Sequence, residues 1–150
     1  MDINKAKDVF RRSGIKFSQQ RLQIFLLLNN KNEPISADDI YLELIKGESN
    51  NINISTVYRI LGLFTKKGLV LKSNLNIDGK ATFEINHRDH RHHLICIQCG
   101  KIVPISGCPL KEYERSLIKK TNYLILEHNL EIRGICPECQ KIRESKDIGI

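Results

Sequence analysis

Apolar residues recur at every third or fourth position through much of the first half of the chain, which is the period of an amphipathic helix. In residues 54–67, for example, Val57, Ile60, Leu61 and Phe64 fall on one helical face. The predicted helices are residues 5–12, 19–29, 37–46 and 54–67. A capping residue precedes each of them, and the predicted caps are Asn4, Ser18, Ser36 and Asn53.

The period changes after Gly68. Residues 69–75 and 81–85 have the length and composition of short strands, and Asp78-Gly79 between them is a hairpin-turn signal. Helices followed by a two-stranded hairpin predict a winged-helix domain over residues 1–85. Residues 86–92 are polar and are the predicted hinge to a second domain.

The second domain, residues 93–150, is predicted to mix strands with one helix. Pro109 opens the helix, which runs to about Thr121, and the charged tail from Lys141 is expected to fray. The predicted strands are residues 94–97, 101–105, 123–126 and 130–135. The fold class is therefore α+β, with a winged helix followed by a small α/β domain.

Composition and charge indicate the kind of partner and the cellular compartment. The chain has 150 residues, a formal net charge of +7 and a pI of about 9.2, which favours nucleic acid as a partner. The N-terminus does not resemble a signal peptide, and no apolar run is long enough to span a membrane. We therefore expect a cytoplasmic protein with reduced thiols and no membrane partner.

The start of the helix predicted at residues 54–67 is the candidate DNA-reading stretch. It is polar and rich in hydroxyl groups, and free N–H groups at a helix N-terminus favour phosphate. An arginine there can bind phosphate or pair with guanine through two hydrogen bonds. With basic residues on the second helix and the wing, the candidates are Arg21, Ser55, Thr56, Tyr58, Arg59, Lys72 and Lys80. The alternative is an ordinary core helix with a solvated polar start.

Four of the five cysteines form two Cys-x-x-Cys pairs about forty residues apart. Two such pairs with Gly- and Pro-containing turns predict one structural Zn²⁺ held by four thiolates. The predicted ligands are Cys96, Cys99, Cys136 and Cys139. The alternative is redox pairs or inert thiols, and Cys108 stands apart as a small residue whose role as ligand or redox group is open.

All five histidines follow residue 86, and His90, His92 and His93 run into a predicted strand. Alternate residues of a strand face opposite sides of the sheet, so these histidines can supply ligands to two different metal sites. The candidate sets are His90 and His92 with His128 and Glu112, and Glu84 with His93. Imidazole with carboxylate suits Fe²⁺, Zn²⁺, Mn²⁺ or Co²⁺ without selecting among them. The alternative is a surface cluster that binds metal adventitiously.

With these motifs in order, the chain resembles the ferric uptake regulator (Fur) family from about residue 10 to 140. The matching segments are Ser18-Gln19-Gln20-Arg21, Ser36-Ala37-Asp38-Asp39-Ile40-Tyr41, Thr56-Val57-Tyr58-Arg59, His93-Leu94-Ile95-Cys96 with Cys99-Gly100-Lys101, and Gly134-Ile135-Cys136 with Cys139. The resemblance implies a homodimeric repressor with a C-terminal dimerisation domain, four-cysteine structural zinc and a palindromic operator. It also implies a regulatory metal at the hinge, which draws the DNA-binding domains into the operator's spacing.

The chain departs from the family pattern at the hinge. Glu33-Pro34 stands where a histidine is usual, so Glu33 is at best a substitute ligand, and Arg91 and Pro104 replace two further ligands. The second site keeps its histidines, although Lys111 aligns with its carboxylate and Cys108 could belong to an unusual set. The resemblance implies Fe²⁺ or Zn²⁺ as corepressor, with Mn²⁺ less favoured.

Three alternatives to a metal-dependent repressor remain open from the sequence. A peroxide-sensing regulator of the same family fits less well because hinge ligands are missing. A zinc enzyme needs an open metal position and a nearby base, and no nucleophile elbow supports one, so no catalytic residue is predicted. An interaction module in which zinc only staples the fold is the third alternative.

Overall fold

The computed structural model describes residues 2–31, 33–47, 52–74, 78–87 and 92–147. The chain divides into two compact units, residues 1–87 and 88–150. The model is α+β, as predicted. Each helix in the described part of the chain is too short or too polar to cross a bilayer.

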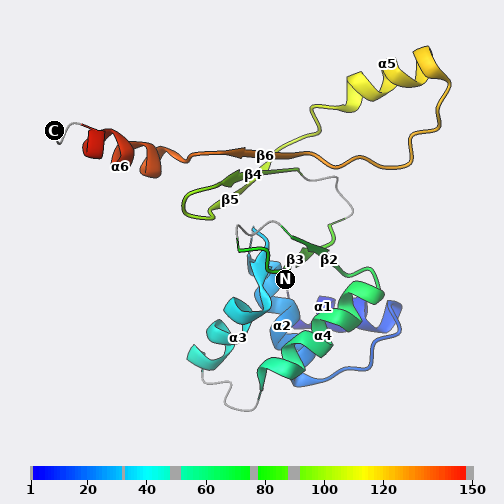
Figure 1. The fold of residues 1–150 in the computed structure, drawn as a ribbon. Helices are drawn as coiled ribbons and strands as arrows, with labels where there is room; N and C mark the ends of the chain where they lie inside the picture. The colour runs from blue at the N-terminus through cyan, green and yellow to red at the C-terminus, as the bar shows by residue number, and fades with distance from the viewer. Residues whose placement is uncertain (1, 32, 48–51, 75–77, 88–91, 148–150) are drawn as a thin grey trace. The chain divides into compact units, whose positions relative to one another are not determined.

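The first unit contains four helices and a small sheet (Figure 1). Its elements are α1 (Ile3–Arg12), α2 (Gln19–Asn30), β1 (Ile35–Ser36), α3 (Ala37–Lys46), α4 (Ile54–Lys66), β2 (Val70–Ser73) and β3 (Thr82–Ile85). The sheet order is β1-β3-β2, and β2 and β3 form the predicted antiparallel hairpin. This arrangement is the winged helix that the sequence predicts.

Side-chain caps begin three of these helices as predicted. Ser18 accepts from the Arg21 N–H, Ser36 from the Asp39 N–H, and Asn53 from the Thr56 N–H at 2.8 Å. The prediction of Asn4 as the first cap is wrong, because Asp2 takes that place and accepts from the Asn4 N–H. The two-residue strand β1 was not predicted, since it is too short to show a period.

The core of the first unit is apolar and aromatic. The rings of Phe10, Phe25 and Phe64 lie 5.2–5.8 Å apart, centroid to centroid. Their helices α1, α2 and α4 meet around these rings, and Ile24, Ile40 and Leu61 are fully buried beside them. Packing of this kind fixes the exposed face of α4 relative to the wing.

The second unit is a three-stranded sheet with two helices. Its elements are β4 (His92–Cys96), β5 (Ile102–Ile105), α5 (Lys111–Thr121), β6 (Glu131–Gly134) and α6 (Pro137–Asp147). The sheet order is β5-β4-β6, with β4 antiparallel to β5 and parallel to β6. In Figure 1, α5 stands at the end of two extended connections, and none of its residues is buried.

Two predictions for the second unit are wrong. Residues 123–126 are not a strand, although Tyr123, Leu124 and Leu126 are highly exposed apolar side chains. The tail does not fray from Lys141, because α6 continues to Asp147. Pro137 explains the helix start, since its fixed φ and missing N–H suit the first helical turn.

Candidate metal centres and nucleic-acid interface

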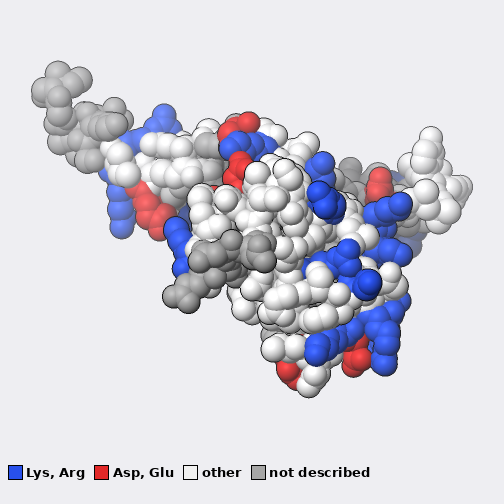
Figure 2. Space-filling view, turned by 90° about the horizontal axis from the view of Figure 1, so that it is seen from below, with Lys and Arg blue, Asp and Glu red and all other residues white. Residues whose placement is uncertain are grey.

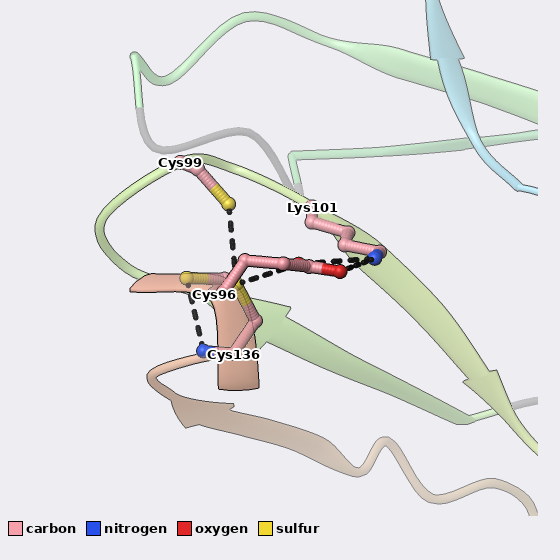
Figure 3. Close-up of polar contacts among 5 residues, drawn as sticks. Cys96, Cys99, Lys101 and Cys136 are labelled. Atoms are coloured by element: carbon pink, nitrogen blue, oxygen red, sulfur yellow. Dashed lines mark hydrogen bonds and ion pairs between the residues drawn. The ribbon is translucent and has the colours of Figure 1, made fainter. Parts of the chain in front are cut away.

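The four paired cysteines converge on one point of the second unit. Their sulfurs all lie within 4.8 Å of one another, and the Cys99 and Cys136 sulfurs are 3.7 Å apart. Four thiolates at about 2.3 Å from a tetrahedral zinc would be separated by about 3.8 Å. Figure 3 shows Cys96, Cys99 and Cys136 approaching from the two knuckles. The cluster therefore fits one Zn²⁺ in a closed four-sulfur site.

Strand pairing explains how residues forty positions apart meet. Cys96 ends β4 opposite Gly134 of the parallel strand β6, so the knuckle that follows β6 lies beside the one that follows β4. The first knuckle closes tightly, because the Gly100 N–H donates to the Cys96 carbonyl at 2.9 Å. Gly100 has a φ of 76°, a left-handed conformation that glycine adopts without steric cost.

The surroundings favour ionisation of one cysteine thiol and disfavour ionisation of another. The Cys136 N–H donates to the Cys96 sulfur at 3.3 Å, which with further backbone N–H groups lowers the pKa of Cys96 to about 6. The hydrogen bond with Cys136 and the surrounding sulfurs raise the pKa of Cys139 to about 12. Four thiolates this close together need a cation between them, which a bound Zn²⁺ supplies.

A charged pair borders the cysteines. The Lys101 ammonium donates to the Glu138 carboxylate at 3.1 Å, and the Cys136 thiol donates to the same carboxylate at 3.3 Å (Figure 3). The hydrogen bond to Lys101 lowers the pKa of Glu138, and the same contact raises the pKa of Lys101. The ammonium therefore offsets part of the negative charge of the thiolates.

A second cluster of metal ligands lies in the same unit. The Nε2 atoms of His92 and His128 are 3.2 Å apart, and the Cys108 sulfur lies 3.3 Å and 3.2 Å from them. The two rings stack with centroids 5.0 Å apart. His92 begins β4, Cys108 lies between β5 and α5, and His128 precedes β6. His92 is buried, and the other two side chains are half-buried.

The carboxylate of this cluster differs from the one predicted. Glu112 instead accepts from the Arg115 guanidinium at 2.6 Å, on the exposed side of α5. Glu114, two residues further along the helix, is in hydrogen-bond contact with His128 Nδ1. Sequence spacing does not distinguish the two, since each could face the cluster if α5 rotated. The role of Cys108 was open in the sequence, and the structure places its sulfur within 3.3 Å of both histidine Nε2 atoms.

The other predicted ligands are not assembled in one unit. Glu84 and Glu33 belong to the first unit, where Glu84 is buried on β3 and Glu33 is exposed. His93 is buried on β4 of the second unit. His90 lies outside the described residues. The hinge set of Glu84, His93 and Glu33 thus stays a prediction.

The candidate DNA-binding residues lie on exposed parts of the first unit. Ser55, Tyr58 and Arg59 are exposed on the first turns of α4, and Tyr58 has half of its surface accessible. Thr56 is half-buried beside them. Its N–H donates to the Asn53 side chain at 2.8 Å, and the Val57 N–H donates to the Asn53 carbonyl at 3.2 Å, so Asn53 caps the exposed start of the helix.

The flanking basic residues have different surroundings. Lys72 is exposed on β2, and the guanidinium of half-buried Arg21 donates to the Lys16 carbonyl. Lys80 is exposed and forms a 3.0 Å ion pair with Asp38. Figure 2 shows more Lys and Arg than Asp and Glu on the face that it draws. A phosphate approaching Lys80 would compete with Asp38.

Comparison with known proteins decides the family. The model of the ferric uptake regulator family matches residues 12–133. The chain belongs to the ferric uptake regulator family. The "ferric uptake regulation protein" of Bordetella parapertussis is 34% identical over 134 residues, which cover 89% of this chain and 95% of that protein. The one from Escherichia coli K12 is 35% identical over 130 residues, covering 85% and 86%.

A solved Fur structure has the same fold. The Helicobacter pylori ferric uptake regulator, whose structure reveals three functional metal-binding sites, superposes with a TM-score of 0.77 and 26% identity. The match covers 92% of this chain and 91% of that one. Fur-family membership agrees with the winged helix and the two ligand clusters. The resemblance stated from the sequence motifs is confirmed.

Proposed function

We propose that this Fur-family chain is a homodimeric, metal-dependent transcriptional repressor that works in the cytoplasm and has no enzymatic activity. It binds a palindromic operator when a regulatory divalent ion is bound, Fe²⁺ or Zn²⁺ in preference to Mn²⁺. One observation carries the proposal: a winged helix with an exposed, polar start of α4 shares its chain with a unit that holds two clusters of metal ligands.

The metal sites have different tasks in this proposal. Cys96, Cys99, Cys136 and Cys139 would hold structural Zn²⁺, because a closed four-sulfur site has no position open to a second ligand. His92 and His128, with His90 from the sequence prediction, would hold the regulatory ion. The hinge ligands Glu84, His93 and Glu33 stay in the proposal as a further regulatory set. Metal binding and DNA binding then strengthen each other reciprocally.

The exposed surface of the second unit supports the homodimer. Leu94, Val103 and Ile132 lie in register across the three strands, and each has more than 40% of its surface exposed. The helix α5 buries none of its residues, and the apolar side chains of Tyr123, Leu124 and Leu126 are even more exposed. Contiguous exposed apolar surface marks an interface. A second copy of the chain would cover it and give residues 123–126 a strand to pair with.

DNA binding by the zinc-loaded protein, titrated in parallel with Fe²⁺, Mn²⁺ and additional Zn²⁺, tests the proposal. We expect fluorescence anisotropy to show metal-dependent binding to a palindromic operator, weakened by salt because phosphate contacts release counterions. Absent or metal-independent binding would contradict the repressor and favour a zinc-stapled interaction module.

The double variant Tyr58→Phe with Arg59→Ala should remove operator binding and leave the fold and the zinc content unchanged. Lys66→Ala is the matched control, since Lys66 is an exposed basic residue on the last turn of the same helix. It should bind the operator like the unmodified protein. Equal losses in both variants would mean that general charge, rather than the start of α4, is responsible.

A further inference from the structure

We propose that Cys108 is a ligand of the second metal centre, together with His92 and His128, and that this thiolate set selects Zn²⁺ over Fe²⁺ and Mn²⁺. The inference deepens the proposed function, on which its regulatory meaning rests. It assigns a role to the one cysteine outside the Cys-x-x-Cys pairs. It also narrows the choice of metal that the sequence left open.

The three ligand atoms already have the separations of a metal site. A tetrahedral ion with nitrogens at about 2.05 Å and a sulfur at about 2.3 Å has a nitrogen–nitrogen edge of about 3.3 Å and nitrogen–sulfur edges of about 3.6 Å. The observed distances are 3.2 Å between the two Nε2 atoms and 3.2–3.3 Å from each to the sulfur. Only a few tenths of an ångström separate this arrangement from a coordination shell.

Glu114 fixes the tautomer of one histidine. Its carboxylate contacts His128 Nδ1, so that nitrogen carries the proton of a neutral ring, and Nε2 presents its lone pair to the cluster. A carboxylate on the far nitrogen is the usual outer contact of a metal-bound histidine. Glu114 therefore orients a ligand without being one.

Hydrogen bonds alone account poorly for the triangle. With His128 Nε2 as an acceptor, the His92 N–H would have to serve both His128 and the sulfur. The thiol proton would have to share the single His128 lone pair with it. A cation instead satisfies three lone pairs at once. The short contacts are thus better explained as a ligand set.

The surroundings leave room for a metal ion to enter. A cleft of about 570 Å³ adjoins the cluster and is lined by Cys108, Glu114 and His128, with Lys111 and Ile118 from α5. His92, the third member of the cluster, is buried. Three protein ligands beside an open cleft leave a fourth position to water or to a further ligand, as in an exchangeable site rather than a closed one.

The donor atoms decide the preferred ion. Mn²⁺ favours oxygen ligands, whereas thiolate and imidazole together suit Zn²⁺, and Zn²⁺ also stands above Mn²⁺ and Fe²⁺ in general affinity for such sites. The predicted set of two or three histidines and a carboxylate would not discriminate in this way. Cys108 is therefore the residue that determines specificity.

Cobalt substitution tests the ligand directly. The full-length protein, with Zn²⁺ in the four-cysteine site and the second site emptied by a mild chelator, is titrated with Co²⁺. We expect one further equivalent to bind, with tetrahedral d–d absorption and a sulfur-to-cobalt charge-transfer band. Cys108→Ser should lose that band and bind Co²⁺ about 10-fold to 100-fold more weakly. A band that persists in Cys108→Ser, or no band in the unmodified protein, would overturn the proposal.

Two glutamate variants on α5 separate the outer contact from general charge. Glu114→Gln should weaken Co²⁺ binding about tenfold and keep the charge-transfer band. Glu112→Gln, two residues away and directed toward Arg115, is the matched control and should bind like the unmodified protein. If both variants weakened binding equally, the role of Glu114 would be refuted. Cobalt-edge X-ray absorption of the unmodified protein should show one sulfur together with imidazole ligands, and needs no variant to fold.

The metal preference of the second site and the proposed repressor function are tested by separate measurements. Cys108→Asp replaces sulfur by oxygen and should narrow the preference for Zn²⁺ over Mn²⁺ in a competition titration; an unchanged ratio would refute the selectivity. Operator binding is measured on the same samples. A sulfur–cobalt band without metal-dependent DNA binding would contradict the proposed function and support Cys108 as a ligand. Metal-dependent DNA binding without the band would support the proposed function and contradict Cys108 as a ligand.

Discussion

The two units of this chain bury different kinds of side chain. In the first unit the buried residues form one apolar cluster around Phe10, Phe25 and Phe64. In the described part of the second unit, Ile95 and Ile102 are buried together with four metal-ligand types of side chain, which are Cys96, Cys139, His92 and His93. One unit has a conventional core, and the other has a small sheet built around candidate ligands.

This difference indicates what each unit needs in order to fold. Burial of apolar side chains contributes about 1.5–3 kcal/mol for each large residue, so the first unit can be stable on its own core. A unit of about sixty residues with few buried apolar groups usually needs a metal, a disulfide or a partner. We therefore expect the second unit to need zinc and a second copy of the chain for its stability.

Removing zinc from the four-cysteine site should separate the behaviour of the two units most clearly. Binding of structural Zn²⁺ contributes on the order of 10 kcal/mol to the folding of small zinc domains, because the site does not exist in the unfolded chain. We expect a strong chelator, or Cys96→Ser, to unfold the second unit and abolish the dimer while residues 1–87 stay folded. Circular dichroism, limited proteolysis and sedimentation would record the partial loss.

Cys108→Ser serves as the matched control for that experiment, since it removes a thiol from the same unit but outside the four-sulfur site. It should keep the structural zinc and the dimer. A stable, zinc-free dimer of Cys96→Ser would show that the four-cysteine site does not hold the unit together.

Phe64→Ala should have the opposite effect, destabilising the first unit and leaving the second unit intact. The ring is fully buried against Phe10 and Phe25, and a Phe→Ala change in a packed core costs about 3–5 kcal/mol. We expect the first unit to melt at a lower temperature or to be unfolded, with the zinc content of the second unit unchanged. Thermal unfolding followed by circular dichroism, with zinc measured on the same sample, checks both halves.

Phe17→Ala is the control for a phenylalanine outside the core, because Phe17 is exposed and its ring lies 5.2 Å from the Lys7 ammonium. It should change stability little. Loss of zinc from Phe64→Ala would show that the units do not fold independently.

The sequence predicted the first unit well because its signals are local. Val57, Ile60, Leu61 and Phe64 follow the helical period and are all buried in α4. Ser36 and Asn53 are capping residues whose side chains accept the predicted N–H groups. Periodicity and caps depend on neighbours along the chain, so one sequence is enough to read them.

Predictions for the second unit failed where structure depends on distant contacts. Residues 123–126 form a short, continuous apolar run of the kind found in strands, yet a strand also needs a neighbour to pair with, and a single chain gives them none in the described residues. The charged tail was expected to fray, although Pro137 begins a helix there. The pattern along one segment does not show whether a neighbouring strand is available to pair with it.

The metal centres show the same limit. Two Cys-x-x-Cys pairs carry their own spacing, and the four sulfurs meet as predicted. No spacing links Cys108 to His92 and His128, or separates Glu114 from Glu112, because these residues meet only after the sheet and α5 have formed. The resemblance to the Fur family implied the histidines, and it left Cys108 only as a possible member of an unusual ligand set.

The smallest expected effect comes from the cap of α4, and it refines the comparison within the first unit. The Asn53 side chain accepts the Thr56 N–H at 2.8 Å, and loss of such a cap costs about 1 kcal/mol. Asn53→Ala should therefore lower the melting temperature of the first unit by about 4–8 °C, and Asn53→Ser, which restores an acceptor, should recover most of it.

Because α4 also carries Tyr58 and Arg59, its cap links stability to recognition. Fraying of the first turn would misplace the side chains and N–H groups at the start of α4. Asn53→Ala should therefore weaken operator binding even at temperatures where the protein is still fully folded. Zinc content and the dimer, which belong to the second unit, should not change. If Asn53→Ala instead released zinc, a local change in the first unit would have destabilised the second unit. The two units would then not be stabilised separately.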